Sequence, residues 1–437
     1  MTKSRRDINS LSPAELDDYI HALGILRARS AADPSDATGY DFQAALHNGG
    51  IDSNGLTVGP CEHGTDQFLP WHRSHLYHFE KLLQESDPPR TANVTLPYWD
   101  WLHPQADGKF PPAFSLPELA MDRNPDPVDL PPNTLEIVTT ETDQGLFGGF
   151  PSAHPGADFG RLEGGPHNFM HSDFIGGLMA DPGSAAMDPI YFSFHAFIDL
   201  LWAEWQQRNG SPPLTSPDHN LRGFDSQVKH KTADFADTVA LGYDYAYTDR
   251  LKADFAVETP QPVTRRLLAT EPLSLVSAPN LTASLRSNAR AKFSLAAPPT
   301  EARKVMVRLD DLKVPVAGSY VLRAYVHPAD VHFRADDADF ASRYGVGYVA
   351  MWQAHRMATG GDHAPAHTGG AQPHSHPAEC NARFDITAVL DASDAAPEDL
   401  VLTLQYLPSP DPYGRPREAP GLLDEVALQD VLMEVYS

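Results

Sequence analysis

The sequence has very few cysteines, only Cys61 and Cys380 among its 437 residues. At most one disulfide bond can form, which is typical of proteins that stay in a reducing compartment. The segment MTKSRRDINSLS contains two adjacent arginines but no apolar stretch after them, so it does not predict a signal peptide. We therefore expect a cytoplasmic protein, with export by a partner protein as the alternative.

The sequence also lacks long apolar runs and an excess of positive charge. No apolar run reaches the roughly 18 residues that a membrane-spanning helix needs. Lysine and arginine number 33 against 58 aspartates and glutamates, which gives a formal net charge of −25. This charge disfavours nucleic acid and anionic lipid as partners, and it favours neutral or cationic small substrates.

Histidine, by contrast, is abundant, with 20 residues. His167 and His171 are four residues apart in PHNFMH, so on a helix their side chains leave the same face about 5–6 Å apart. Two imidazoles at this spacing can share one metal ion, and His195 follows as a third candidate ligand. Asp199, one helical turn beyond His195, is placed to hydrogen-bond back and orient a ring.

A second set of three candidates, His47, His63 and His72, precedes the first. A ligand set made only of histidines favours a transition metal over magnesium or calcium. A zinc ion with three histidines would be a mononuclear hydrolytic site. Two such sets in one chain favour a dinuclear redox centre, although any single histidine beside aromatic residues is more often a packing or surface residue.

Four segments resemble signature segments of a known family: HGTDQFLPWHRSHLYHFEKLL, LPYWDW, LEGGPHNFMH and DPIYFSFHAFIDLLWAEW. They are similar to those of tyrosinases and polyphenol oxidases, the type 3 copper proteins that include catechol oxidases and molluscan-type haemocyanins. The resemblance covers roughly residues 5–250. It implies two copper ions per chain, one held by His47, His63 and His72 and the other by His167, His171 and His195. The family often has a histidine just before the last ligand, where this chain has Phe194.

The same resemblance implies roles for three further residues. Cys61 stands two positions before His63, where relatives form a thioether bond to the ligand ring. Glu163 and Asn168 resemble a pair that holds a water able to deprotonate a monophenol, although Glu163 could instead cap a helix. The implied reaction partners are phenolic small molecules and O2, and the implied products are quinones of the kind that feed melanin formation.

The sequence pattern predicts two folded domains. Residues 1–255 are expected to form a mainly α catalytic domain, a four-helix bundle around a dicopper site, with one helix starting after Ser12 and another ending near His47. Residues 256–300 read as a surface linker. Residues 301–437 contain short alternating apolar runs between turns and predict an all-β sandwich. In tyrosinases a motif similar to YDYAY packs against an N-terminal arginine, so the resemblance implies a cation–π contact of this motif with Arg5 or Arg6.

The β domain is similar to the C-terminal domains of haemocyanins and latent polyphenol oxidases, which implies a lid over the active site. An aromatic residue would then plug the site, with Tyr325, Phe333, Tyr344 and Tyr348 as candidates. The histidine-rich stretch 355–376 predicts either copper collection or a solvated loop.

These features together predict a tyrosinase-like copper monooxygenase that hydroxylates monophenols at the ortho position and oxidises o-diphenols to o-quinones with O2. The alternatives are a catechol or o-aminophenol oxidase without hydroxylase activity, a haemocyanin-like oxygen carrier, and a zinc or di-iron enzyme. The absence of carboxylates from both histidine sets disfavours the zinc or di-iron enzyme. An oligomer is compatible with all of them.

Overall fold

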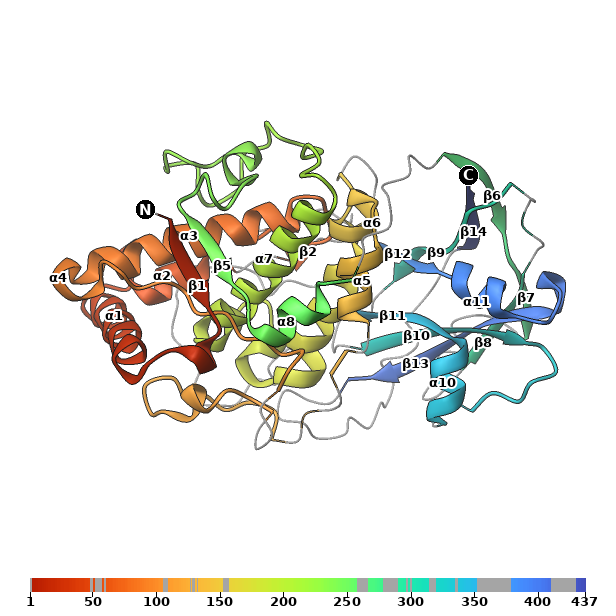
Figure 1. The fold of residues 1–437 in the computed structure, drawn as a ribbon, viewed down its shortest axis with the longest axis horizontal. Coiled ribbons are helices and arrows are strands. Elements are labelled where there is room, and N and C mark those ends of the chain that lie inside the picture. Colours follow the sequence, from red (N-terminus) through yellow and green to blue (C-terminus); the bar gives the residue numbers. More distant parts are fainter. Residues whose placement is uncertain are drawn as a thin grey trace.

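The computed structural model contains a helical unit, which extends to Phe255, and a β-rich unit beside it (Figure 1). The structure describes residues 2–47, 50–51, 57–58, 60–104, 109–125, 127, 130–131, 133–151, 157–257, 266–277, 290–295, 298, 301–313, 320–334, 337–351, 379–409 and 430–437. Within those ranges, no helix is long and apolar enough to cross a membrane.

Two long helices, α3 (Phe68–Ser86) and α7 (Ile190–Arg208), form the centre of the helical unit. Around them lie α1 (Pro13–Ala32), α2 (Tyr40–Ala45), α4 (Pro88–Thr91), α5 (Thr134–Thr140), α6 (Gln144–Gly148) and α8 (Asp249–Asp254). α1 starts as predicted, because Ser12 and Glu15 form a capping box and Pro13 occupies the first turn. α2 ends two residues before His47, which also agrees with the prediction.

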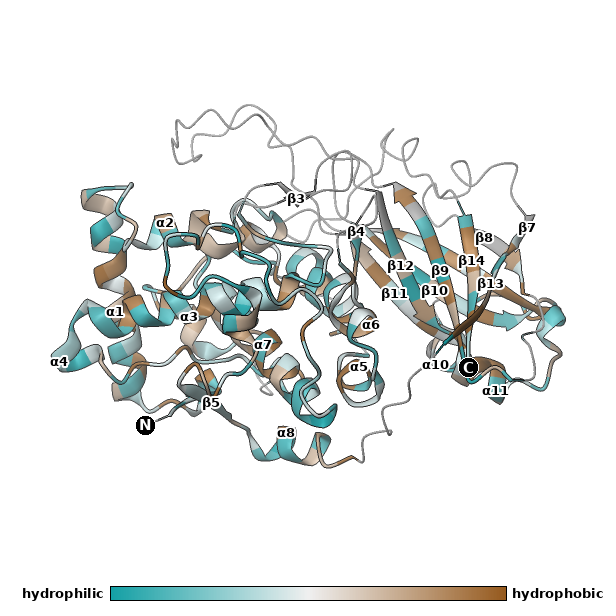
Figure 2. Cartoon of the chain, turned by 90° about the horizontal axis from the view of Figure 1, so that it is seen from above, coloured by the Kyte–Doolittle hydropathy of each residue, from teal (hydrophilic) through white to brown (hydrophobic). Residues whose placement is uncertain are grey.

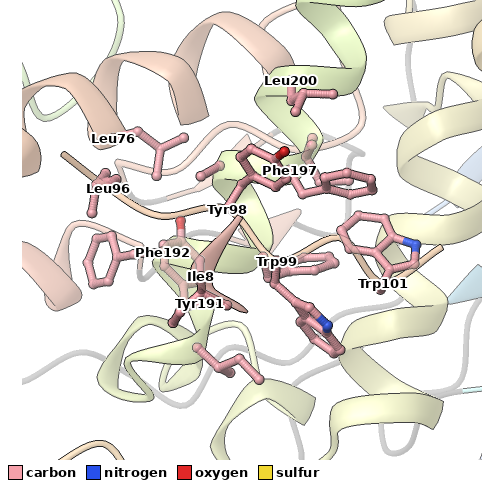
Figure 3. Packing of buried hydrophobic residues seen from close by; sticks show 14 of the residues in the cluster. Ile8, Leu76, Leu96, Tyr98, Trp99, Trp101, Tyr191, Phe192, Phe197 and Leu200 are labelled. Atoms are coloured by element: carbon pink, nitrogen blue, oxygen red, sulfur yellow. The ribbon is translucent and has the colours of Figure 1, made fainter. Parts of the chain in front are cut away.

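Aromatic side chains fill the space around α7 (Figure 3). Phe192 stacks on Phe79 of α3 with ring centroids 3.7 Å apart. Further along α7, Phe197 meets the edge of Trp101 at 4.5 Å. α7 is buried around most of its circumference, as expected of a helix that is apolar on all sides. His195 on this helix therefore lies in the interior of the unit.

The chain around His167 is not the regular helix that the spacing predicts. It forms two π-helical turns, Glu163–His167 and Met170–Ile175, which we call the π segment. Pro166 lies inside the first turn and has no N–H to donate, and Gly165 departs from helical geometry (φ −99°, ψ −105°). Such irregular turns often occur where side chains must be re-aimed at functional sites.

The N-terminal strand pairs with a strand near the C-terminal end of the helical unit's sequence. β1 (Lys3–Arg6) pairs in parallel with β5 (Tyr243–Ala246). The buried Arg5 guanidinium lies 3.7 Å from the centre of the Tyr243 ring, which identifies Arg5 as the cation of the predicted contact. Arg5 also pairs with Glu80 at 2.9 Å and with Asp199 at 3.2 Å. A short hairpin, β2 (Gly50–Ile51) and β3 (Thr57–Val58), lies elsewhere in this unit.

The β-rich unit consists of two five-stranded sheets with strand orders β11-β10-β13-β8-β7 and β4-β12-β9-β14-β6. The strands are β4 (Ala157–Asp158), β6 (Leu267–Pro272), β7 (Ser274–Ser277), β8 (Arg290–Ser294), β9 (Lys304–Lys313), β10 (Tyr320–Pro328), β11 (Gly345–Met351), β12 (Glu379–Asp385), β13 (Leu400–Pro408) and β14 (Asp430–Tyr436). Two short helices, α10 (Ala338–Tyr344) and α11 (Thr387–Ala392), join them. Apolar and polar positions alternate along several strands, as the sequence pattern predicts (Figure 2).

The prediction of a plain linker at 256–300 is wrong for its described residues. β6 pairs with β14, while β7 and β8 pair with each other and β8 also pairs with β13. The segment thus contributes strands to both sheets. Its Pro, Ala, Ser and Thr content does not predict strands. Backbone pairing with distant strands outweighs the weak β propensity of these residues.

The first sheet presents one face to its own core and the other to the helical unit. Val349 of β11 packs into the sandwich core, whereas its neighbour Ala350 packs against Phe169 of the helical unit, together with Val321 of β10. Alternation along the strands explains this division, because successive side chains point to opposite faces. β10 and β11 therefore cover the π segment.

Charged residues also join the two units. Lys304 of β9 donates to the buried Glu141 carboxylate, with distances of 3.1 and 2.8 Å from Nζ to the two oxygens. Arg383 of β12 pairs with Asp158 of β4. Buried ion pairs lose much of their energy to desolvation, but losing one partner leaves a costly unpaired charge. These ion pairs therefore mainly determine the relative orientation of the two units, and they contribute little to the net free energy of unfolding.

Candidate metal centre

The first set of candidate ligands lies where α2 ends and α3 begins. His47 follows α2, His63 lies in the loop before α3, and His72 lies within α3. The Nε2 atoms of His47 and His63 are 3.4 Å apart. Together with Cys61 Sγ, one donor atom of each of the three histidines lies within 4.8 Å of all the others.

The second set comes from the π segment and α7. The Nε2 atoms of His167 and His195 are 3.1 Å apart, and the ring of His171 is 4.6 Å from that of His167. The two sets meet at His72, whose ring stacks on His195 at 4.5 Å and shares a 4.8 Å donor cluster with His167 and His195. The structure therefore brings all six predicted ligands into one buried cluster, although a loop supplies His63 and the π segment replaces one expected helix.

Every ring in the cluster is oriented by a hydrogen bond from its Nδ1 to an oxygen. The bonds run from His47 to Pro182 O (3.1 Å), His63 to Glu163 Oε1 (2.9 Å), His72 to Phe68 O (2.7 Å), His167 to Asn168 Oδ1 (2.9 Å), His171 to Met179 O (2.9 Å) and His195 to Tyr191 O (3.1 Å). Carbonyl and carboxylate oxygens accept, so each ring donates from Nδ1 and keeps a lone pair on Nε2. This is the outer support that metal-binding histidines usually have.

The electrostatics favour neutral rings. Burial, reinforced mainly by neighbouring imidazoles, lowers the pKa well below its usual range for His47, His72, His167, His171 and His195. Neutral imidazole is the form that binds a metal. In their neutral forms, His167 and His195 direct Nε2 lone pairs at each other across 3.1 Å, and these repel unless a cation lies between them. The donor set thus fits a transition metal that prefers nitrogen ligands, copper included.

Glu163 lies beside the first histidine set although it belongs to the π segment. Its Oε1 accepts from His63 Nδ1 at 2.9 Å and from the Gly64 backbone N–H at 2.8 Å. The residue is fully buried, and burial raises the pKa of its carboxyl group while the bonds to His63 and Gly64 lower it. Glu163 therefore links the two halves of the centre.

Asn168 has both ends of its amide engaged. Oδ1 accepts from His167, and Nδ2 donates to the Ala350 carbonyl of β11 at 2.9 Å. The side chain thus connects a candidate metal ligand directly to the β-rich unit. No sequence motif predicts this second bond, because its acceptor is a backbone carbonyl far along the chain.

Cys61 is a buried free thiol at the edge of the first set. Its Sγ lies 3.8 Å from His72 Nε2. Burial raises the pKa of the thiol well above its usual range, with Glu163 and Glu62 adding to the effect. The predicted bond to His63 stays a prediction.

Phenylalanines near the histidine cluster divide into those that contact the ligand rings and those that pack elsewhere. Phe68 contacts the rings of both His72 and His167 at 4.7 Å. Phe194, the residue that replaces a histidine of the family pattern, lies 5.0 Å from His171. Phe79, Phe192 and Phe197 belong to the aromatic core, and Phe169 belongs to the contact with the β-rich unit.

The expectation that Asp199 orients a metal ligand is wrong. His195 uses the carbonyl of Tyr191 instead, and Asp199 accepts from Arg73, Arg5 and two tyrosine hydroxyls. The two arginines hold the pKa of Asp199 below its usual value despite burial. Asp199 is therefore an anchor between α7, α3 and the N-terminus.

The sequence matches a family model described as the common central domain of tyrosinase over residues 37–142 and 132–208, a span that contains all six histidines. A tyrosinase of Streptomyces antibioticus is 32% identical over 216 residues, covering 40% of this chain and 75% of that protein. The chain belongs to the tyrosinase and polyphenol oxidase family. Tyrosinase HcTyr1 of Hahella sp. (strain CCB-MM4) is 28% identical over 333 residues, covering 63% of this chain and 69% of that protein.

The fold likeness extends over both units. A solved structure of latent apple tyrosinase superposes with a TM-score of 0.64 at 19% identity, covering 100% of this chain and 96% of that one. The β-rich unit is therefore part of a known two-unit arrangement. Family membership identifies the chain as a type 3 copper oxidoreductase, and its histidine cluster could hold the dicopper centre that the family binds.

We expect His195→Gln to lower the copper content from two ions per chain, because a ligand with an Nε2 lone pair is lost. Copper would be measured per folded chain after loading and dialysis. His78→Gln is the matched control, since His78 lies on α3 and donates to Lys229 O without joining the cluster. Unchanged copper in His195→Gln would contradict the ligand assignment.

Proposed function

We propose that the protein is a tyrosinase-like monooxygenase and oxidase, which hydroxylates monophenols at the ortho position and converts o-diphenols to o-quinones with O2. The convergence of six buried imidazoles, each fixed by an Nδ1 hydrogen bond, supports this proposal. In such a site, His47, His63 and His72 would hold one copper and His167, His171 and His195 the other. A copper pair supplies dioxygen binding and two-electron redox chemistry.

Hydroxylation also needs a base near the incoming phenol. Phenols have a pKa near 10, so a monophenol is almost wholly protonated at neutral pH. Glu163 Oε2 accepts only the longer, 3.0 Å bond from Gly64 among its described partners, which leaves it capacity to bind a water. Asn168, five residues on, faces the same centre through His167. We assign this pair to removal of the phenol proton.

Two narrower functions use the same histidines. A catechol or o-aminophenol oxidase would accept only substrates that ionise more readily, and an oxygen carrier like haemocyanin would exclude substrate altogether. The bond from Glu163 to His63 would serve all three functions, whereas the remaining capacity of Glu163 Oε2 favours the hydroxylase, which needs a base at this place.

Replacement of Asn168 by leucine tests the hydroxylase role. We expect monophenol turnover to fall by about a hundredfold, which is typical for loss of proton-transfer assistance. Diphenol turnover should fall much less, and it serves as the control for folding and copper content. Equal losses with the two substrates would refute the assignment.

We also propose the thioether between Cys61 and His63. Its supports are the CEH motif and the position of Cys61 Sγ among the donor atoms of the first set. The peptide that contains both residues should be lighter by two hydrogen atoms after copper and oxygen treatment. Alkylation of Cys61 in copper-loaded protein would rule the bond out.

We further propose that the β-rich unit keeps the enzyme latent. β11 covers the π segment, and Tyr348 packs on Phe169 with ring centroids 5.5 Å apart. Its hydroxyl lies 3.9 Å from the point where a side chain on Gly165 would begin. The other plug candidates, Tyr325, Phe333 and Tyr344, belong to a separate cluster within the β-rich unit. Tyr348 is therefore the candidate best placed to obstruct access.

If the proposal holds, cutting the chain between Phe255 and Leu267, together with mild detergent, should raise diphenol oxidation several-fold. Lys304→Met should raise the rate without cleavage, because it leaves Glu141 buried without its lysine partner and weakens the contact between units. Lys252→Met is the control, since Lys252 pairs with Asp249 on the surface. Unchanged rates after cleavage with detergent would indicate a permanently open enzyme.

A further inference from the structure

Tyr191, in the first turn of α7, lies between one candidate ligand of each histidine set. Its ring centroid is 4.0 Å from that of His195 and 4.7 Å from that of His47. The residue is fully buried. A single side chain therefore contacts both sides of the metal centre, without belonging to either ligand set.

The hydroxyl of Tyr191 meets a second buried residue that is not a ligand candidate. His75 Nδ1 lies 3.2 Å from the Tyr191 hydroxyl, and His75 Nε2 lies 2.9 Å from Gln43 O. A carbonyl oxygen only accepts, so Nε2 carries the proton and Nδ1 accepts from the tyrosine. Burial lowers the pKa of His75 to about 4, which agrees with this neutral form.

These bonds connect the three helices that lie around the centre. Gln43 belongs to α2, which ends beside His47, while His75 belongs to α3 and Tyr191 to α7. The Tyr191 backbone carbonyl also accepts from His195 Nδ1 at 3.1 Å. Tyr191 thus fixes His195 through its backbone and touches His47 through its ring.

Simple core packing does not account for a polar pair at this place. A buried hydroxyl and a buried imidazole both lose hydration, which apolar side chains of the same volume would avoid. Phe192, the next residue along α7, has no polar group of its own and stacks on Phe79. The polar pair adds a fixed position, because its hydrogen bonds hold the Tyr191 ring in one place between His47 and His195.

We propose that Tyr191 and His75 are positioning residues that set the separation of the two ligand sets. The inference rests on the proposed binding of copper by His47 and His195. Loss of outer partners of metal-binding histidines typically weakens metal affinity by 10–100-fold. The pair should therefore govern how tightly copper is held, more than how stable the metal-free chain is.

The test compares Tyr191→Phe with Tyr40→Phe. Tyr40 is a matched buried tyrosine whose hydroxyl donates to Ala186 O at 3.1 Å and whose ring packs on Phe79 and Phe192. We expect both variants to lower the melting temperature of the metal-free protein to a similar extent. Only Tyr191→Phe should weaken copper binding, by about tenfold in competition with a chelator.

Two variants of the partner keep the test decisive if Tyr191→Phe folds poorly. His75→Asn retains an acceptor oxygen near the Nδ1 position, whereas His75→Leu retains none. Copper affinity should follow the order wild type, His75→Asn, His75→Leu, and adding Tyr191→Phe to His75→Leu should cause no further loss.

Equal copper affinity in Tyr191→Phe, Tyr40→Phe and wild type, or in His75→Asn and His75→Leu, would overturn the positioning role. Failure of the wild type to bind copper would instead overturn the proposed function. Copper affinity is measured without phenol, so the two failures are distinguishable.

Discussion

The structure depends on burying six imidazoles so that their Nε2 atoms face one another. Such an arrangement is unfavourable in a metal-free chain, because adjacent lone pairs repel and the rings lose hydration. Outward hydrogen bonds from every Nδ1 offset part of this cost and prevent the rings from turning away. The aromatic core around α7 and the ionic anchor at Asp199 then keep α3 and α7 at a fixed distance.

Most of the helical unit could be predicted, because its signals are local. The capping box at Ser12 marks the start of α1, and the aromatic pattern around His72 and His195 marks buried helices. The π segment could not be predicted, since it depends on how Pro166 and its glycine neighbours fit against the cluster. The π segment nevertheless brings the rings of His167 and His171 together, as the four-residue spacing predicts.

The candidate metal ligands could be predicted from the sequence, whereas the hydrogen-bond acceptors that orient them could not. His47 and His195 are visible from motifs, but the acceptors for their Nδ1 groups are backbone carbonyls, which carry no sequence signal. The same limit explains the wrong role for Asp199, whose partners come from the distant N-terminus and from β5. Strands β6 to β8 were missed for a related reason, because strand pairing across the chain decides them.

Two of the six candidate ligands, His63 and His167, are oriented by side chains and not by backbone carbonyls. Backbone carbonyls orient four of the histidines, whereas Glu163 orients His63 and Asn168 orients His167. The pair that we assign to the phenol proton is thus also the pair that holds one ligand on each side, so the proposed catalysis and the metal geometry use the same two side chains.

The Ala350 carbonyl occupies one N–H of Asn168 as long as β11 is in place. Displacement of β11 would free that donor for a water without disturbing the bond to His167, because Oδ1 and Nδ2 are separate groups. The proposed latency and the proposed hydroxylation would therefore be coupled through one amide, and opening the β-rich unit would affect the base as well as access.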